Sequence, residues 1–223
     1  MSGFIWLSYP LSEKTPAYGG GEGLKVKTLK NIQQGDSCNN ASWQLPNHLG
    51  THVDAPRHFF AHGQSLDQFP PSFWVFSRVA IMEAAPDGQS NLIEKEAVLS
   101  SLTGDPELLL LITKMGERRG RDDYITHNPG LSPELAPALK NNYPSLRAVG
   151  IDSISISSWQ NRQAGREAHR AFLNPHGERP LLLIEDMFLA PLREGVFISR
   201  VFVLPMLVEN ADGAPCTVLA ELH

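Results

Sequence analysis

The chain has 223 residues, of which 42% are apolar and 19% are charged. These values are ordinary for a globular protein and allow a substantial buried core. The formal net charge of −5 gives no reason to expect a nucleic acid or an anionic membrane as partner. No internal repeat or long linker interrupts the sequence, so we expect a single domain over residues 1–223.

Cysteine content and the lengths of the apolar runs bear on the cellular compartment. Cys38 and Cys216 are the two cysteines, too few for a zinc site with four cysteine ligands. The apolar start, Met1 to Leu7, is too short for a secretion signal, and runs such as Leu108 to Ile112 are far too short to span a membrane. We therefore expect a cytoplasmic chain with free thiols.

The first part of the chain has the pattern of strands joined by loops. The apolar stretch Phe4 to Leu11 predicts a short strand. Thr15 to Lys25 is rich in glycine and predicts a loop, but its glycines lack the spacing of a phosphate-binding loop. Leu24 to Ile32 alternates between apolar and polar residues and predicts a second strand, and Ser42 to Pro46 predicts an extended segment.

The segment from His48 to His58 carries three histidines and one aspartate, His48, His52, Asp54 and His58. All four side chains can bind a divalent cation or transfer a proton. A fully extended strand would separate His48 from His52 by roughly 13 Å. A single ion cannot hold both, because its bonds to nitrogen are only about 2 Å long. The chain must therefore curl between them, and Gly50 permits the curl because glycine tolerates positive φ.

Beyond the curl, residues 51–55 alternate with the period of a strand. His52 and Asp54 are expected to share one face, opposite the other three residues of this range. Pro56 cannot donate a hydrogen bond to a neighbouring strand, so it is expected to end the pairing. His58 follows this break, a position that suits a proton-transfer group better than a direct metal ligand.

The rest of the chain alternates between strand-like and helix-like segments, as in an α/β or β-rich domain. Prolines 70 and 71 predict a loop over Leu66 to Phe73. The expected strands are Trp74 to Ala84, Leu108 to Thr113, Leu146 to Ile156, Leu181 to Glu185, Val196 to Leu204 and an edge strand, Val218 to Leu222. The expected helices are Glu94 to Leu102 with Ser90 or Asn91 as cap, Ser132 to Leu139 with Ser132 as cap, and Glu167 to Leu173.

Two further polar residues occupy positions where functional side chains are often found. His169 lies on an expected helix, and Glu185 directly follows four apolar residues at the end of an expected strand. Binding sites of α/β proteins tend to form at such strand ends. Neither residue can be connected to His48 by sequence spacing alone.

The string His-x-Gly-Thr-His-x-Asp-Ala-Pro-x-His-Phe over residues 48–59 resembles the signature of the metal-dependent cyclase family. That family includes bacterial kynurenine formamidases and isatin hydrolases. Leu7 to Leu11 with Thr15-Pro16 resembles the family's N-terminal strand and loop, and Val149 to Ser153 resembles a later core strand. His169 with Leu182 to Leu192 resembles its closing segment. The resemblance therefore extends through most of the chain.

The resemblance implies a mixed β/β/α domain of the swivelling type, with a central barrel-like sheet and flanking helices. It implies a homo-oligomer, a dimer or tetramer, that acts on a small molecule and binds a divalent metal, zinc or manganese. It implies His58 as the catalytic histidine. The metal ligands that it implies are His48, His52, Asp54, His169 and Glu185.

The chain also departs from the formamidase pattern at several positions. Trp6 replaces a frequent Asp, Tyr9 a frequent His and Ser157 a frequent Asp, while Met187 replaces part of a common Asn-Leu pair. An insertion-like stretch, Asn174 to Pro180, lengthens the segment between the last two implied ligands. These departures leave the metal chemistry in place and the substrate open.

Together these features predict hydrolysis of an amide, lactam or ester bond by metal-activated water, with His58 transferring the proton. The expected substrate is small and aromatic or cyclic. One alternative is a serine hydrolase that uses a serine of residues 153–158 with His169, although no G-x-S-x-G elbow is present. Another is a non-catalytic protein of the same fold that binds a metal or a small ligand.

Several aromatic residues are candidates for the substrate pocket, and four histidines are expected at the surface. The aromatic candidates are Trp43, Phe59, Phe60, Trp74 and Trp159. The surface histidines are His62, His127, His176 and His223, of which His62 lies near enough to the motif to be a further site candidate.

Overall fold

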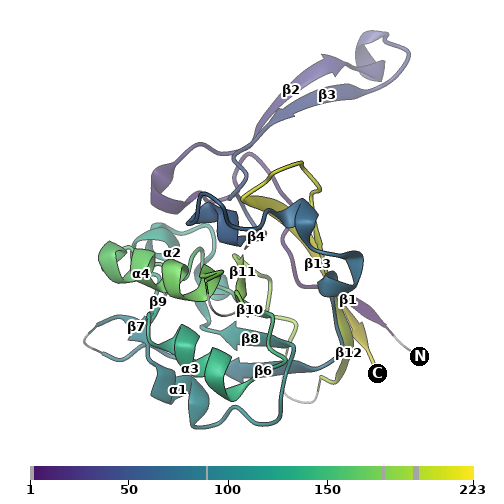
Figure 1. Cartoon of the computed structure of the whole chain (residues 1–223). Helices are drawn as coiled ribbons and strands as arrows, with labels where there is room; N and C mark the ends of the chain where they lie inside the picture. The colour runs from purple at the N-terminus through teal and green to yellow at the C-terminus, as the bar shows by residue number, and fades with distance from the viewer. Residues whose placement is uncertain (1–2, 89, 177–178, 193–195) are drawn as a thin grey trace.

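A computed structural model describes residues 3–88, 90–176, 179–192 and 196–223 (Figure 1). Its strands are β1 (Phe4–Trp6), β2 (Lys25–Lys30), β3 (Asn40–Gln44), β4 (His52–Asp54), β5 (Val75–Phe76), β6 (Val79–Glu83), β7 (Leu92–Ile93), β8 (Leu108–Ile112), β9 (Gly130–Leu131), β10 (Ala148–Ile151), β11 (Leu182–Glu185), β12 (Ile198–Pro205) and β13 (Gly213–Leu222). Its helices are α1 (Lys95–Leu99), α2 (Asp122–Thr126), α3 (Leu135–Asn142) and α4 (Arg162–Leu173).

One mixed sheet organises the molecule, with the strand order β5-β12-β13-β4-β11-β10-β8-β6 and β1 added beside β13. The half from β5 to β11 is antiparallel, and the half from β11 to β6 is parallel. Strands β5 and β6 end this order but are joined through residues 77–78 alone, so the sheet comes close to closing on itself. The expected mixed fold with a central barrel-like sheet and flanking helices is confirmed.

The parallel strands are buried on both faces, which explains their continuous apolar sequences. Leu108 and Leu110 of β8 point into the interior of the curved sheet and pack with Phe76 and Val201. Leu109 points the other way, into a second core. That second core lies beneath α1, α3 and α4, which cover the outer face of the parallel half (Figure 1). No helix within the described residues is long and apolar enough to cross a membrane.

The hairpin of β2 and β3 projects away from the rest of the molecule (Figure 1). Every residue of its two strands is exposed. The hairpin therefore has no buried face against the rest of the molecule. A two-stranded hairpin without such packing is only marginally stable in water.

Three predicted strands were too long. Phe4 to Leu11 contains β1, which ends at Trp6. Trp74 to Ala84 is two strands: β5 pairs with β12 and β6 with β8, because the chain turns between them at the junction of the nearly closed sheet. Leu146 to Ile156 contains β10, which stops at Ile151; the chain bends at the next residues, and the Ile156 amide binds Glu185 instead of a neighbouring strand.

The last strand was predicted too short and in the wrong place. β13 begins at Gly213 rather than Val218, and it pairs with β12, β4 and β1, so it is a central strand and not an edge. Its first residues include Gly213 and Pro215, which disfavour strands locally, and tertiary pairing overrides that preference.

The predicted helix starts were also displaced. α1 begins after Glu94, while the side chain of Asn91 binds the carbonyl of Asn128 and caps no helix. α3 begins at Leu135, after Glu134 rather than Ser132. α4 begins five residues before the expected Glu167, because the side chain of Asn161 accepts a hydrogen bond from the Ala164 amide and starts the helix there.

Candidate metal centre

Strand β4 places His52 and Asp54 on the outer face of the sheet, toward α4, where both are buried. Val53 points to the opposite face and packs in the core inside the sheet, as the alternating pattern predicts. The predicted curl before this strand is present: Gly50 has φ of +68°, and a Cβ atom there would lie 2.5 Å from the side chain of Leu11. The strand ends at Asp54, and the 3₁₀ turn η3 (Pro56–His58) follows it.

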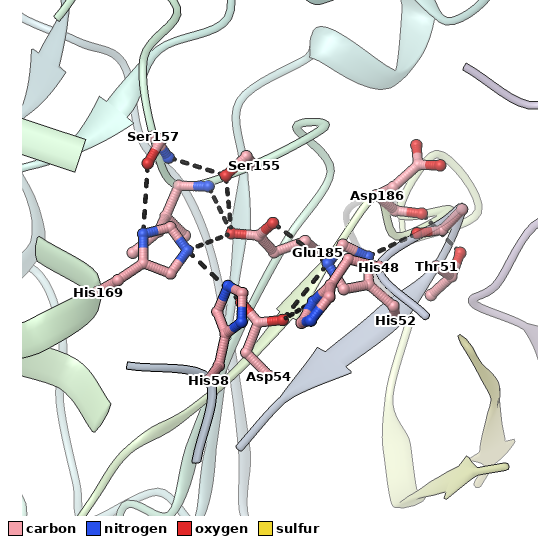
Figure 2. Close-up of polar contacts among 12 residues, drawn as sticks. His48, Thr51, His52, Asp54, His58, Ser155, Ser157, His169, Glu185 and Asp186 are labelled. Atoms are coloured by element: carbon pink, nitrogen blue, oxygen red, sulfur yellow. Dashed lines mark hydrogen bonds and ion pairs between the residues drawn. The ribbon is translucent and has the colours of Figure 1, made fainter. Parts of the chain in front are cut away.

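Strand pairing brings Glu185 to this motif. In the register between β4 and β11, Glu185 lies opposite His52, and its Oε2 is 3.4 Å from His52 Nε2. His169 approaches from α4: its Nε2 lies 3.4 Å from Glu185 Oε1 and 3.5 Å from Asp54 Oδ2 (Figure 2). The Ile156 amide donates to Glu185 Oε1 at 2.7 Å, which holds that carboxylate in place.

Backbone carbonyls determine which nitrogen of two histidines carries hydrogen. His52 Nδ1 donates to the carbonyl of Gly50 at 2.8 Å, and His169 Nδ1 donates to the carbonyl of Gly165 at 2.9 Å. A carbonyl can only accept, so both Nδ1 atoms are protonated. The Nε2 atoms, which face the carboxylates of Asp54 and Glu185, are therefore the nitrogens that can offer a lone pair to a metal.

His48 and His58 share one carboxylate, that of Asp212. His48 Nδ1 faces Asp54 Oδ1 at 2.7 Å, and its Nε2 lies 3.1 Å from Asp212 Oδ2. His58 Nδ1 lies 3.0 Å from the same Oδ2 atom. Gly213 allows this approach, because a Cβ atom there would overlap the His48 ring.

Asp212 was not among the residues singled out from the sequence. It precedes β13, and β13 pairs with β4 so that Gly213 lies opposite Asp54. The only local signal is the Asp-Gly pair, which is common in turns and says nothing about a site.

The arrangement fits one or two divalent cations. Asp54 belongs to two groups of three possible ligands. One group is His48, His52 and Asp54, and the other is Asp54, His169 and Glu185. Within each group the donor atoms lie within 4.8 Å of one another. Asp212 forms a third such group with His48 and His58. Imidazole nitrogens and carboxylate oxygens are the donors that zinc and manganese accept, and a cation would balance the buried carboxylates.

The pKa values of the buried histidines show that the carboxylates of Asp54 and Glu185 strongly favour a positive charge beside them. Burial by itself lowers the pKa of His52, but hydrogen bonding to Glu185 and the charges of Asp54 and Glu185 outweigh burial and raise it to about 9. The same carboxylates overcome burial and raise the pKa of His169 to about 10. Burial and Asp54 disfavour the charge of Glu185, yet the two histidines hold its pKa at about 2.

His58 differs from the histidines inside the cluster. Burial lowers the pKa of His58 and outweighs the opposing charge of Asp54. Its imidazole is therefore neutral at neutral pH and able to accept a proton.

The cluster opens into a cavity of about 510 Å³. All five predicted ligands and His58 line it. Of the five predicted aromatic residues, Phe59 lines this cavity, with its ring stacked on His169 at 5.0 Å between centroids. Trp43 is 67% exposed on the hairpin, and Trp74 is buried in the core.

The departures at positions 6 and 9 lie away from the cavity. Trp6 and Tyr9 line a separate cavity of about 670 Å³, together with Thr51. Ser157 does reach the site, with its Oγ 3.3 Å from His169 Nδ1. Met187 is buried in the core.

Other sequence features lie apart from the centre. The four remaining histidines, His62, His127, His176 and His223, are exposed as expected. Residues 177–178 of the insertion-like stretch fall outside the described part of the chain.

The geometry does not favour the serine hydrolase alternative. A serine nucleophile needs a histidine with a free lone pair facing its hydroxyl. His169 Nδ1, the nitrogen that faces Ser157, already donates to the carbonyl of Gly165 and carries hydrogen. It cannot accept a proton from Ser157.

Comparison with known proteins identifies the family. A kynurenine formamidase of Geobacillus thermodenitrificans is 26% identical over 217 residues, which cover 96% of this chain and 95% of that protein. An uncharacterized protein of Haemophilus influenzae is 31% identical over 112 residues, which cover 48% of this chain and 78% of that protein.

Solved structures resemble the whole fold. Isatin hydrolase A from Labrenzia aggregata, bound to benzyl benzoate, has a TM-score of 0.78 at 18% identity and covers 99% of this chain and 93% of its own. A predicted metal-dependent hydrolase from Bacillus stearothermophilus has a TM-score of 0.75 at 21% identity, and the match covers 99% of this chain and 98% of that protein. Residues 5–158 match the family described as putative cyclase, and the chain therefore belongs to that family.

Proposed function

We propose that this protein is a metal-dependent hydrolase that cleaves an amide, lactam or ester bond in a small aromatic or cyclic substrate. The observation that carries the proposal is the convergence of five potential ligands and His58 on one cavity. The kynurenine formamidase and isatin hydrolase relatives support a reaction at a carbon–nitrogen bond of the arylformamidase or cyclic amidase type.

The metal would be zinc or manganese. The residues that would hold it are His48, His52, Asp54, His169 and Glu185. When bound, such a cation lowers the pKa of water toward about 7 and polarises a carbonyl group.

His58 is the group that moves the proton. Its Nδ1 donates to Asp212, which leaves Nε2 with the lone pair. Among the described residues Nε2 has no hydrogen-bond partner, and the side chain lines the cavity. His58 can therefore take a proton from the attacking water and return it to the leaving nitrogen or oxygen.

Asp212 positions both imidazoles. Its Oδ2 atom accepts hydrogen bonds from His48 Nε2 and His58 Nδ1 at the same time. These bonds direct the other nitrogen of His48 toward Asp54 and leave that of His58 free for the reaction.

The His58→Ala variant tests the proposal. We expect purified wild-type protein to contain zinc or manganese and to hydrolyse members of a panel of formanilides, isatins and lactones. In the variant, metal content should be retained while kcat falls about 10²- to 10⁴-fold, the usual contribution of a general base.

The other outcomes each point to a different function. Unchanged turnover in the variant would remove His58 from the mechanism. Full metal occupancy without hydrolysis of any panel member would indicate a binding protein, and activity that survives chelation would indicate metal-independent catalysis.

A further inference from the structure

Two arginines of α4 line the same cavity as the five candidate metal ligands, which we call the metal cluster. Arg162 and Arg166 are four residues apart and so lie on one side of the helix, the side that also carries His169. Within the part of the chain that the structure describes, neither guanidinium pairs with a carboxylate. Arg166 donates to the side-chain amide of Gln163 at 2.8 Å. The cavity is thus lined by two guanidinium groups that form no ion pair with a described carboxylate.

Arg162 is held in place by neighbouring aromatic rings. Its guanidinium lies 4.1 Å from the centroid of the Trp159 ring. Tyr18, another lining residue, packs edge-on against Trp159 at 5.5 Å between centroids. A stacked guanidinium loses less conformational freedom than a free one when it binds a ligand.

Tyr18 lines the same cavity as the two arginines and the candidate metal ligands. Burial raises the pKa of its phenol, and hydrogen bonding and charge from Arg162, together with the charge of Arg166, oppose this shift. The charge of Glu185 acts on the same phenol in the opposite direction. One hydroxyl group is therefore within electrostatic reach of both arginines and of a ligand of the cluster.

We infer that the substrate carries a carboxylate, which Arg162 and Arg166 bind while the bond to be cleaved lies at the metal cluster. Guanidinium groups match the planar, two-oxygen geometry of a carboxylate and pair with it through charge-assisted hydrogen bonds. A cavity of about 510 Å³ accommodates a single substituted ring. The inference rests on the proposed hydrolase function and specifies its substrate class.

The test compares acids with their neutral esters. The metal-loaded protein is supplied with the three isomers of formamidobenzoate and with their methyl esters, and formate release is followed. We expect kcat/KM for the best acid to exceed that of its ester by about tenfold or more, the usual effect of a charge-assisted pair. In Arg162→Gln and Arg166→Gln, this acid-to-ester ratio should fall by about tenfold.

The control is Arg170→Gln, one turn further along α4. It removes the same charge but does not line the cavity, so the ratio should stay at the wild-type value. A wild-type ratio near one would overturn the inference. So would a ratio that neither Arg162→Gln nor Arg166→Gln changes, or one that Arg170→Gln lowers equally.

A binding measurement separates this inference from the proposed function. If neither these compounds nor any member of the earlier panel is hydrolysed, the hydrolase proposal fails, and calorimetry with benzoate and methyl benzoate then decides the inference alone. Benzoate binding that is lost in the double variant Arg162→Gln/Arg166→Gln supports it. Benzoate binding that the double variant retains, or no preference for benzoate over methyl benzoate, contradicts it.

Discussion

At the residue scale, the carboxylate of Asp212 links two histidines with different tasks. His48 faces Asp54 within the metal cluster, and His58 is the proposed proton acceptor. A single oxygen atom, Oδ2, contacts both rings. The side chain thus couples the geometry of the candidate metal site to that of the proposed catalytic base, although it is 37% exposed and comes from the far end of the chain.

The Asp212→Asn variant tests this coupling. The amide has the same shape but no negative charge, and only one of its two terminal atoms can accept. If its oxygen stays on the two histidines, its nitrogen faces the side-chain nitrogen of Asn47, which donates to Asp212 Oδ1 at 2.7 Å. We expect kcat and metal affinity each to fall about 10- to 100-fold, as for other partners of metal-bound histidines. Steady-state kinetics at saturating metal and chelator competition measure the two effects. The nearby exposed Glu209→Gln serves as control, and wild-type values in Asp212→Asn would contradict the assignment.

The two cysteines should differ in reactivity. Cys216 is buried in β13, and burial raises the pKa of its thiol far above that of an exposed cysteine. Cys38 is exposed near the projecting hairpin. A thiol-specific reagent at pH 8 should therefore modify one thiol in the native protein and two after denaturation. Rapid modification of both thiols in the native state would show that Cys216 is accessible.

At the element scale, three neighbouring strands assemble the site. β4 lies between β11 and β13 in the sheet. β11 supplies Glu185, and the turn before β13 supplies Asp212. Because β4 is only three residues long, the curl at Gly50 decides where its side chains point.

The Gly50→Ala variant tests the importance of this curl. Positive φ costs an L-residue roughly 1–2 kcal/mol, and the new Cβ would also collide with Leu11. We expect a loss of unfolding free energy larger than that of Gly104→Ala, measured by urea denaturation. Gly104 has φ of +75° with open space around it, so its variant reports the backbone cost alone. Equal losses in the two variants would show that the contact with Leu11 is tolerated.

At the scale of the whole molecule, the β2–β3 hairpin is an exposed surface with apolar side chains. Its exposed apolar side chains are Val26, Leu29 and Trp43, with Ile32 in the connecting turn. A hairpin with no packed face is marginal, and burial against another chain would stabilise it. Its first strand also carries three lysines, whereas the chain as a whole has a net charge of −5. We propose that a second copy of the chain covers this hairpin.

Solution mass tests this assembly. We expect a dimer or tetramer by sedimentation velocity, and a shift toward monomer in the double variant Leu29→Ser/Trp43→Ser, because both changes remove apolar contact area. Thr28→Ser on the same hairpin is the control and should keep the wild-type mass, because it changes neither a charge nor a large apolar side chain. A wild-type protein that is monomeric at micromolar concentration would refute the proposal.

Predictions from the sequence were most accurate where the governing physics is local. The curl at Gly50, the shared face of His52 and Asp54, and the break at Pro56 follow from φ preferences, side-chain alternation and the missing amide hydrogen of proline. Element boundaries were less accurate. β13 was predicted five residues short, because its glycine and proline give no local strand signal.

The sequence by itself determined which donor types are available and how the segment from His48 to His58 bends, because both depend on neighbouring residues alone. The tertiary structure decided which distant groups join them. Glu185 reaches His52 through the pairing of β11 with β4, and Asp212 reaches His48 across 164 positions through the pairing of β13 with β4. Such pairings are selected by burial of whole strand faces, a property of the assembled sheet that spacing along the chain does not encode.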